Sequence, residues 1–107
     1  MNPTQLDPQI VNLTKAIRQT ESEGNFQAKG GSGEYGAYQF MPATWAGASQ
    51  KYLGKSIPLT QATPQQQNEV AYKQVAEWKS KGFNVGQIAS MWNVGPGKPD
   101  AYLKGNA

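Results

Sequence analysis

The stretch TPQQQNEVAYKQVAEWKSKG, residues 63–82, is the clearest helix in the sequence and decides the fold class. Thr63 is a good N-cap, Pro64 suits the first helical position, and Gln66 stands where the partner residue of a capping box belongs. The residues of its buried side recur at helical spacing and are Val70, Ala71, Gln74, Val75 and Trp78. The pattern predicts a long helix with one buried face.

Two more helices are predicted before this one. An Asp-Pro pair at residues 7–8 supplies an N-cap and a first helical residue, and apolar side chains then recur at helical spacing. A first helix is therefore expected from Pro8 to about Ser22. The segment MPATWAGASQKYL, residues 41–53, is predicted to form a second helix that starts at Pro42.

The remaining segments are expected to be loops and short helices. GNFQAKGGSGEYG, residues 24–36, contains five glycines and predicts a loop with at most a small β-hairpin. After the long helix, Asn84 is a candidate cap for a short helix over residues 85–92, and residues 99–103 predict a last helical turn. The predicted class is mainly α, with about five helices.

Composition limits both the domain count and the chemistry. At 107 residues the chain is expected to be a single domain over 1–107, with residues 1–6 as a flexible lead-in. Cysteine and histidine are absent, which excludes a thiol nucleophile, a Ser-His pair, a disulfide framework and a zinc site of the usual kind. No metal or cofactor is expected. The net charge of +3 favours an anionic partner, but the lysines and arginines are scattered, so nucleic acid is not expected.

The N-terminal sequence does not predict a signal peptide. MNPTQLDPQI lacks a charged start and an apolar run, and no stretch approaches membrane-spanning length. If the protein acts outside a cell, it is expected to be delivered in another way, as part of a phage virion, or to be a domain excised from a longer chain. It is expected to be a monomer or part of a larger chain.

Two glutamates lie at the end of the first predicted helix, in RQTESEGNF, residues 18–26. The apolar stripe of that helix runs through Ile17, and the next position one turn on is Glu21. Glu21 is therefore expected to face the interior side, and Glu23 to face solvent. A carboxyl group against apolar surface has a raised pKa, which suits a general acid. An ordinary surface acid is the alternative that periodicity leaves open.

Three segments occur in a fixed order: ESEGN (21–25), GEYGAYQFMPATW (33–45) and SMWNVGPGKPDAYL (90–103). Together they resemble the signatures of the lysozyme-like lytic transglycosylases, close to the soluble lytic transglycosylase catalytic domain and the resuscitation-promoting-factor domain. The resemblance covers residues 17–102 and implies a mainly α, lysozyme-like α+β fold around a glycan cleft. The matching residues are Glu21, Ser22, Gly36, Ala37, Gln39, Met41, Pro42, Thr44, Trp92, Asn93, Gly95, Pro96 and Gly97.

The resemblance implies a reaction and roles for particular residues. Glu21 matches the family's acid/base, which cleaves the β-1,4 bond between N-acetylmuramic acid and N-acetylglucosamine of peptidoglycan and leaves a 1,6-anhydro end. The predicted substrate-binding residues are Ser22, Tyr38, Gln39, Trp92 and Asn93. The family most often has tyrosine where this chain has Trp92. Indole donates but does not accept a hydrogen bond, so the role of that tyrosine hydroxyl is in doubt here.

Glu34, in GSGEYG, suggests an alternative reaction. It lies where lysozymes place a second carboxylate on a hairpin, so Glu21 and Glu34 together predict a hydrolytic muramidase; the other interpretation of Glu34 is a solvated loop acid. A non-catalytic glycan-binding module is a further possibility, and a helical domain that binds nucleic acid or protein has only the basic charge in its favour. The main prediction is an enzyme of the bacterial cell wall, acting in the periplasm or outside the cell.

Overall fold

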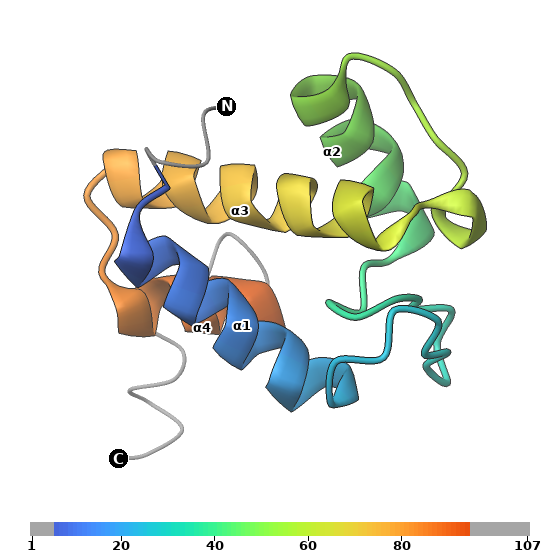
Figure 1. The fold of residues 1–107 in the computed structure, drawn as a ribbon, viewed down its shortest axis with the longest axis horizontal. Helices are drawn as coiled ribbons and strands as arrows, with labels where there is room; N and C mark the ends of the chain where they lie inside the picture. The colour runs from blue at the N-terminus through green and yellow to red at the C-terminus, as the bar shows by residue number, and fades with distance from the viewer. Residues whose placement is uncertain (1–5, 95–107) are drawn as a thin grey trace. The chain divides into compact units, whose positions relative to one another are not determined.

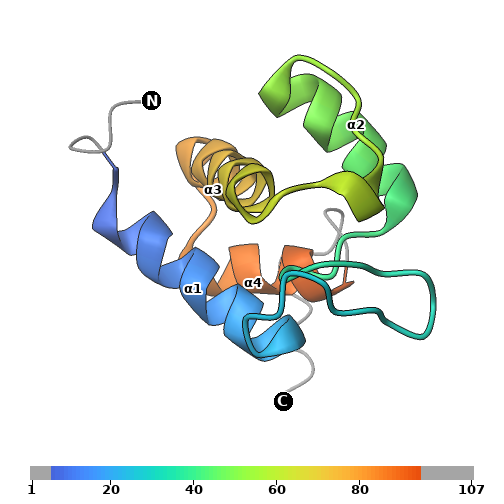
Figure 2. The same ribbon diagram turned by 45° about the vertical axis from the view of Figure 1, so that its right-hand side comes forward.

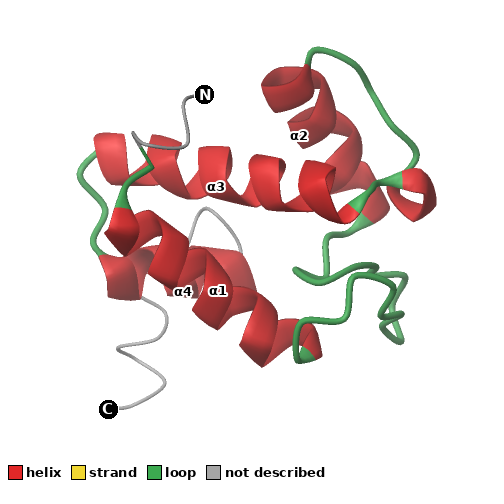
Figure 3. Cartoon of the chain, in the orientation of Figure 1, coloured by secondary structure: helices red, strands yellow, loops and turns green. Residues whose placement is uncertain are grey.

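The computed structural model describes residues 6–94. In this range the chain forms α1 (Pro8–Ser22), α2 (Pro42–Leu53), a 3-10 turn η2 (Leu59–Gln61), α3 (Pro64–Ser80) and α4 (Val85–Val94) (Figure 1). Between residues 6 and 94 the chain contains isolated β-bridges but no regular strand (Figure 3). The mainly α class is thus confirmed, with four α-helices in the described range instead of about five. The predicted turn at 99–103 and nearly all of the lead-in lie outside the described residues.

The starts of α1 and α3 follow from their capping residues. The carboxylate of Asp7 accepts the backbone N–H of Gln9 at 2.8 Å, and Pro8 follows as the first residue of α1. At α3 the predicted capping box is present in both directions. The Thr63 N–H donates to the Gln66 side chain at 2.9 Å, and the Gln66 N–H donates to the Thr63 hydroxyl at 3.1 Å.

The chain divides into two compact units, residues 1–74 and 75–107. The first unit contains α1, α2, η2 and the N-terminal part of α3, and the second contains the end of α3 and α4. The single domain expected over 1–107 stays a prediction.

The core of the first unit is built around a row of aromatic rings. Tyr38 and Phe40 have ring centroids 6.1 Å apart, and Phe40 and Trp45 have centroids 5.0 Å apart. The indole N–H of Trp45 donates to the Ile57 carbonyl at 2.7 Å, which satisfies the polar atom of a fully buried side chain. The other buried apolar residues of this unit are Ile10, Ile17, Ala37, Leu59, Ala62, Val70 and Ala71.

The segment between α1 and α2, residues 23–41, is called the glycine-rich loop below. Figure 2 shows it folded back on itself beyond the C-terminal end of α1. Isolated antiparallel bridges pair Tyr35 with Lys29 and with Phe40. The small hairpin that the sequence allowed is therefore reduced to single bridges, and the aromatic side chains of the loop provide much of the packing of this unit.

The second unit contains the end of α3, a short connecting turn and α4, and its two tryptophans are in contact. α3 ends at Ser80, and α4 begins after a second capping box, in which Asn84 and Gln87 exchange hydrogen bonds of 2.9 and 2.8 Å. The predicted cap of this helix is confirmed. The rings of Trp78 and Trp92 meet edge to face, with centroids 6.1 Å apart and an interplanar angle of 83°.

Candidate active site

The last turn of α1 presents Glu21 and Ser22 and then stops abruptly. The next residue, Glu23, has a left-handed backbone with φ 57°, and Gly24 follows with φ 81°. The Gly24 N–H donates to the Arg18 carbonyl at 3.1 Å, which closes the helix end. A left-handed conformation costs a residue with a Cβ about 1–2 kcal/mol. The surrounding contacts must compensate for this cost next to the predicted acid, and such strain is often found at functional sites.

Glu21 and Glu23 lie in different environments, as the helical periodicity predicts. Glu21 is half-buried and Glu23 is exposed. Burial raises the pKa of the Glu21 carboxyl above its ordinary value, and the negative charge of Glu34 raises it further. Glu21 therefore stays protonated to a higher pH than a solvated glutamate does, which is the property that a general acid needs.

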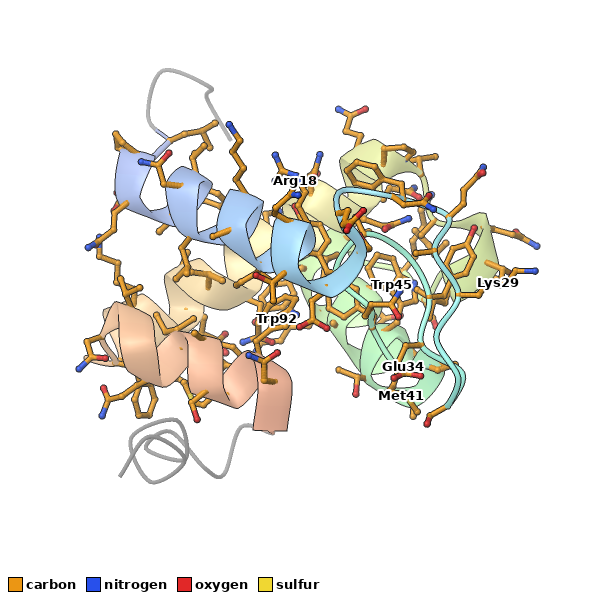
Figure 4. The ribbon with its side chains drawn as sticks, turned by 90° about the horizontal axis from the view of Figure 1, so that it is seen from below. Arg18, Lys29, Glu34, Met41, Trp45 and Trp92 are labelled. Carbon is orange, nitrogen blue, oxygen red and sulfur yellow. The ribbon has the colours of Figure 1, made fainter. Side chains whose placement is uncertain are left out.

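Glu34 lies on the glycine-rich loop and is half-buried (Figure 4). One oxygen of its carboxylate accepts the Ser32 N–H at 2.8 Å, and its backbone carbonyl accepts the Gly30 N–H at 2.8 Å. A Cβ at Gly30 would lie only 2.8 Å from the Glu34 carboxylate, so the loop backbone passes directly beneath that side chain. The structure thus brings both predicted carboxylates into one region of the first unit, close enough for one charge to act on the other.

Ser22 joins the end of α1 to the glycine-rich loop. Its hydroxyl donates a hydrogen bond to the Ala37 carbonyl at 2.7 Å and accepts one from the Asn25 N–H at 3.1 Å. Since these contacts are internal, the structure gives Ser22 a bridging role beside Glu21. The predicted contact between Ser22 and the substrate stays a prediction.

Tyr38 is almost fully buried, with 1% of its surface exposed. Its hydroxyl donates to the Asn68 side chain and accepts from the Arg18 guanidinium at 3.1 Å. Burial raises the pKa of the Tyr38 phenol, and the charge and hydrogen bond of Arg18 partly counter this effect. Little of the Tyr38 surface is open to a ligand, so its role in substrate binding stays a prediction.

Gln39 is the other described non-glycine residue with a positive φ, at 53°. Its side-chain N–H groups donate to the carbonyls of Gly36 at 2.8 Å and Ala28 at 3.1 Å. Both amide protons are therefore used inside the loop, and the side-chain oxygen is the group left for a sugar acetamide.

Trp92 and Asn93 belong to the second unit and were predicted from the third signature. Trp92 is half-buried, packs edge to face on Trp78 and has further interactions. Asn93 is exposed. The rest of that signature, residues 95–103, lies outside the described range.

Two residues near the site were missed by the sequence analysis. Gln67 is a fully buried amide of α3 that bonds to the glycine-rich loop, and Asn68 beside it accepts the Tyr38 hydroxyl. The signal for Gln67 was present in its spacing, because it precedes Val70 by three residues and Ala71 by four and so falls on the buried side of the helix. A glutamine in that stripe is a polar side chain that must find partners in the core.

Two pockets of the first unit lie beside the loop and helices. One of about 420 Å³ is lined by Arg18 and Tyr38 together with residues from the N-terminal halves of α1 and α3. Another of about 400 Å³ is lined by residues 25–27, Tyr35 and residues 60–64. Glu21 and Glu34 line neither of these two pockets.

Across residues 6–94, no group of three or more carboxylate side chains is placed to hold a metal ion. In the same range, no helix has the length and apolar character needed to cross a membrane.

Comparison with known proteins identifies the family. The family model described as transglycosylase-like domain matches residues 11–83. Resuscitation-promoting factor RpfC of Mycobacterium tuberculosis strain Erdman is 37% identical to this chain over 83 residues, which are 73% of this chain and 56% of that relative. The chain thus spans little more than half the length of the relative. No solved structure matches it. The matched segment extends from α1 to the end of α3 and includes both Glu21 and Glu34, and the chain belongs to the transglycosylase-like domain family.

Proposed function

We propose that this protein is a lytic transglycosylase that cleaves the β-1,4 bond between N-acetylmuramic acid and N-acetylglucosamine in peptidoglycan. The observation that supports this most directly is the half-buried carboxyl of Glu21, at the end of α1 and within the influence of a second carboxylate. Membership of the transglycosylase-like family supports the same reaction class.

In the proposed reaction Glu21 acts twice. Its protonated carboxyl donates the proton to the glycosidic oxygen as the bond from that oxygen to C1 of the muramic acid breaks. The carboxylate then takes the proton of the 6-hydroxyl of the same sugar, while that oxygen attacks C1. The products are a free N-acetylglucosamine 4-hydroxyl and a 1,6-anhydro ring, and Glu21 ends protonated as it began. One carboxylate suffices because the nucleophile belongs to the substrate, whereas glycosidases that activate water need two.

The other predicted residues are proposed to hold the glycan. The Gln39 side-chain oxygen is available to accept an acetamide N–H, since its nitrogen is engaged in the loop. Trp92 is proposed to stack on a sugar ring and Asn93 to hydrogen-bond a hydroxyl, both from α4. Ser22 and Tyr38 are proposed to support the shape of the site through their hydrogen bonds. Ser22 bonds to the glycine-rich loop, and Tyr38 bonds to Arg18.

A peptidoglycan digest tests the proposal. Purified sacculi are incubated with the wild type and with Glu21→Gln, and the soluble products are identified by mass spectrometry. We expect anhydro-muropeptides from the wild type and a rate about 10²–10⁴-fold lower from Glu21→Gln, the range usually contributed by a general acid or base. Glu23→Gln, which changes an exposed carboxylate two residues away, is the matched control and should retain activity within about twofold. Wild-type activity that survives in Glu21→Gln would contradict the assignment.

A muramidase is the second candidate, because the charge of Glu34 acts on Glu21. In that reaction Glu34 would orient or activate a water molecule, and the product would have a reducing end in place of the anhydro ring. The same digest separates the two candidates by a mass difference of one water. A protein that binds sacculi but releases no product would instead support the glycan-binding module.

The proposed place of action is the bacterial cell wall, and the proposed partner is the glycan strand. The protein is proposed to act there as a single domain, either as a monomer or as part of a longer chain. The origin in a phage particle stays a prediction.

A further inference from the structure

Gln67 is an uncharged polar side chain in the core of the first unit, with none of its surface exposed. Burying an amide is unfavourable unless its hydrogen bonds are replaced. The Gln67 side-chain oxygen accepts the Ala37 N–H at 2.9 Å, and its nitrogen donates to the carbonyls of Phe26 and Ala62, each at 3.1 Å. Both amide protons and one oxygen lone pair are thus used.

These bonds connect α3 to both arms of the glycine-rich loop. Phe26 lies on the arm that leaves α1 and Ala37 on the arm that returns toward α2, and Glu34 lies between them. The fit is tight at Gly36, which has φ 93°, because a Cβ there would collide with the Gln67 amide. The loop therefore closes directly over this side chain.

Ala37 is held from two sides. Its N–H donates to Gln67 of α3, and its carbonyl accepts from the hydroxyl of Ser22, the residue after Glu21. A single loop residue thus links α3 to the end of the helix that presents Glu21. A shift of the Gln67 amide would be transmitted to both ends of this link.

We propose that Gln67 is a positioning residue that fixes the glycine-rich loop so that Glu34 stays beside Glu21. The proposal rests on the proposed function for its catalytic meaning, but the placement of the two carboxylates is measurable without any activity. Gln67 touches neither carboxylate in the bonds described and acts through Ala37 and Phe26. A residue that only stabilises the fold would lower the melting temperature and leave the two carboxylates in place in the molecules that remain folded.

The test is a double-mutant cycle read at Glu21. The side-chain pKa of Glu21 is measured by carbon-detected NMR titration in the wild type, Gln67→Met, Glu34→Gln and the double variant. Methionine has a similar volume but makes none of the three hydrogen bonds. We expect each single variant to lower the pKa of Glu21, and the double variant to match Glu34→Gln alone. Gln65→Met, which replaces an exposed glutamine of the same helix, should leave the titration unchanged.

Two results would overturn the proposal. One is an unchanged Glu21 titration in Gln67→Met together with a lower melting temperature. The other is a shift of equal size with and without Glu34, because Gln67 would then act on Glu21 by another route. If Gln67→Met does not fold, the same cycle is run with Gln67→Asn, which keeps an amide in the core but is one methylene too short to reach all three partners. The same two results apply.

Activity provides a separate readout. If the proposed function holds, Gln67→Met should move the high-pH limb of kcat/KM to lower pH, as Glu34→Gln is expected to do, and leave the maximal rate largely unchanged. A wild type without activity but with the expected titration cycle would reject the proposed function and keep the positioning role. An active wild type whose Glu21 titration does not respond to Gln67→Met would reject the positioning role and keep the proposed function.

Discussion

The end of α1 presents Glu21 and the glycine-rich loop presents Glu34, but the two regions are built in different ways. α1 is a regular helix in which the position of Glu21 follows from the spacing of the residues before it. The loop has no such repeat, and its path is set by hydrogen bonds to residues that are distant in sequence, such as the bond between Ala37 and Gln67. The helix is therefore specified locally, whereas the loop exists only when the rest of the unit is folded.

The largest effect is expected where the loop has least room. Gly36→Ala introduces a Cβ at φ 93° and against the Gln67 amide. The left-handed strain and the overpacking together should lower the free energy of unfolding by about 2–4 kcal/mol. Gly47→Ala is the matched change in the helical region, because Gly47 is an exposed residue within α2 with nothing within 4 Å of the added Cβ. It should instead raise stability by about 0.5–1 kcal/mol.

Urea denaturation of these two variants measures the difference. The comparison between loop and helix fails if both alanines change stability in the same direction by a similar amount. A loss at Gly36 well below about 1 kcal/mol would mean that the Gln67 amide can move aside without cost.

A smaller effect is expected from the charge of the loop. Glu34→Gln removes the negative charge that raises the pKa of Glu21, so that pKa should fall. Glu21 must be protonated to begin the proposed reaction, and activity is lost as pH rises through its pKa. The high-pH limb of kcat/KM should therefore move to lower pH, with the maximal rate largely kept. A complete loss of activity at every pH would favour the muramidase, in which Glu34 takes part directly.

The smallest effect concerns stability at the helix end. Because the pKa of Glu21 is raised above its ordinary value of 4.5, the stability that its protonation contributes is fully present below that value and is lost as pH rises through the folded-state pKa. Glutamine stays neutral throughout, so Glu21→Gln should be more stable than the wild type at pH 7. Calorimetry should show a gain under about 4 °C, since about 1 kcal/mol corresponds to 4–8 °C and water screens a half-exposed carboxyl. The gain should vanish below pH 4.5; a gain that persists there would not come from ionisation.

Local features of the sequence were sufficient to predict the helices. The capping box of Thr63 and Gln66 and the cap at Asn84 were predicted from residue type and position, and α1 has its expected bounds of Pro8 and Ser22. The same reasoning predicted the different exposure of Glu21 and Glu23. The turn η2 was not predicted, because three residues are too few to show a period.

The inner structure of the loop was not predictable in this way. The substrate-binding role of Tyr38 stays a prediction, but the sequence did not indicate that its ring packs against Phe26 and Phe40 or that its hydroxyl bonds to Arg18 and Asn68. These partners lie 12 to 30 residues away from it except for Phe40, and no local pattern indicates which of them it meets. Aromatic residues suit sugar rings and cores equally well, and only the folded chain separates the two uses.

The hydrogen bonds that Ser22 and Gln67 make to the loop join uncharged groups, and this affects how ionic strength acts on the site. Dissolved ions weaken interactions between charges that lie farther apart than about 10 Å at 0.1 M salt, or about 3 Å at 1 M salt. They leave hydrogen bonds between neutral groups nearly unchanged. The charge interaction between Glu34 and Glu21 is repulsive, so salt relieves it without loosening the loop. Concentrated salt should thus tune the acidity of Glu21 while the backbone around it keeps its shape.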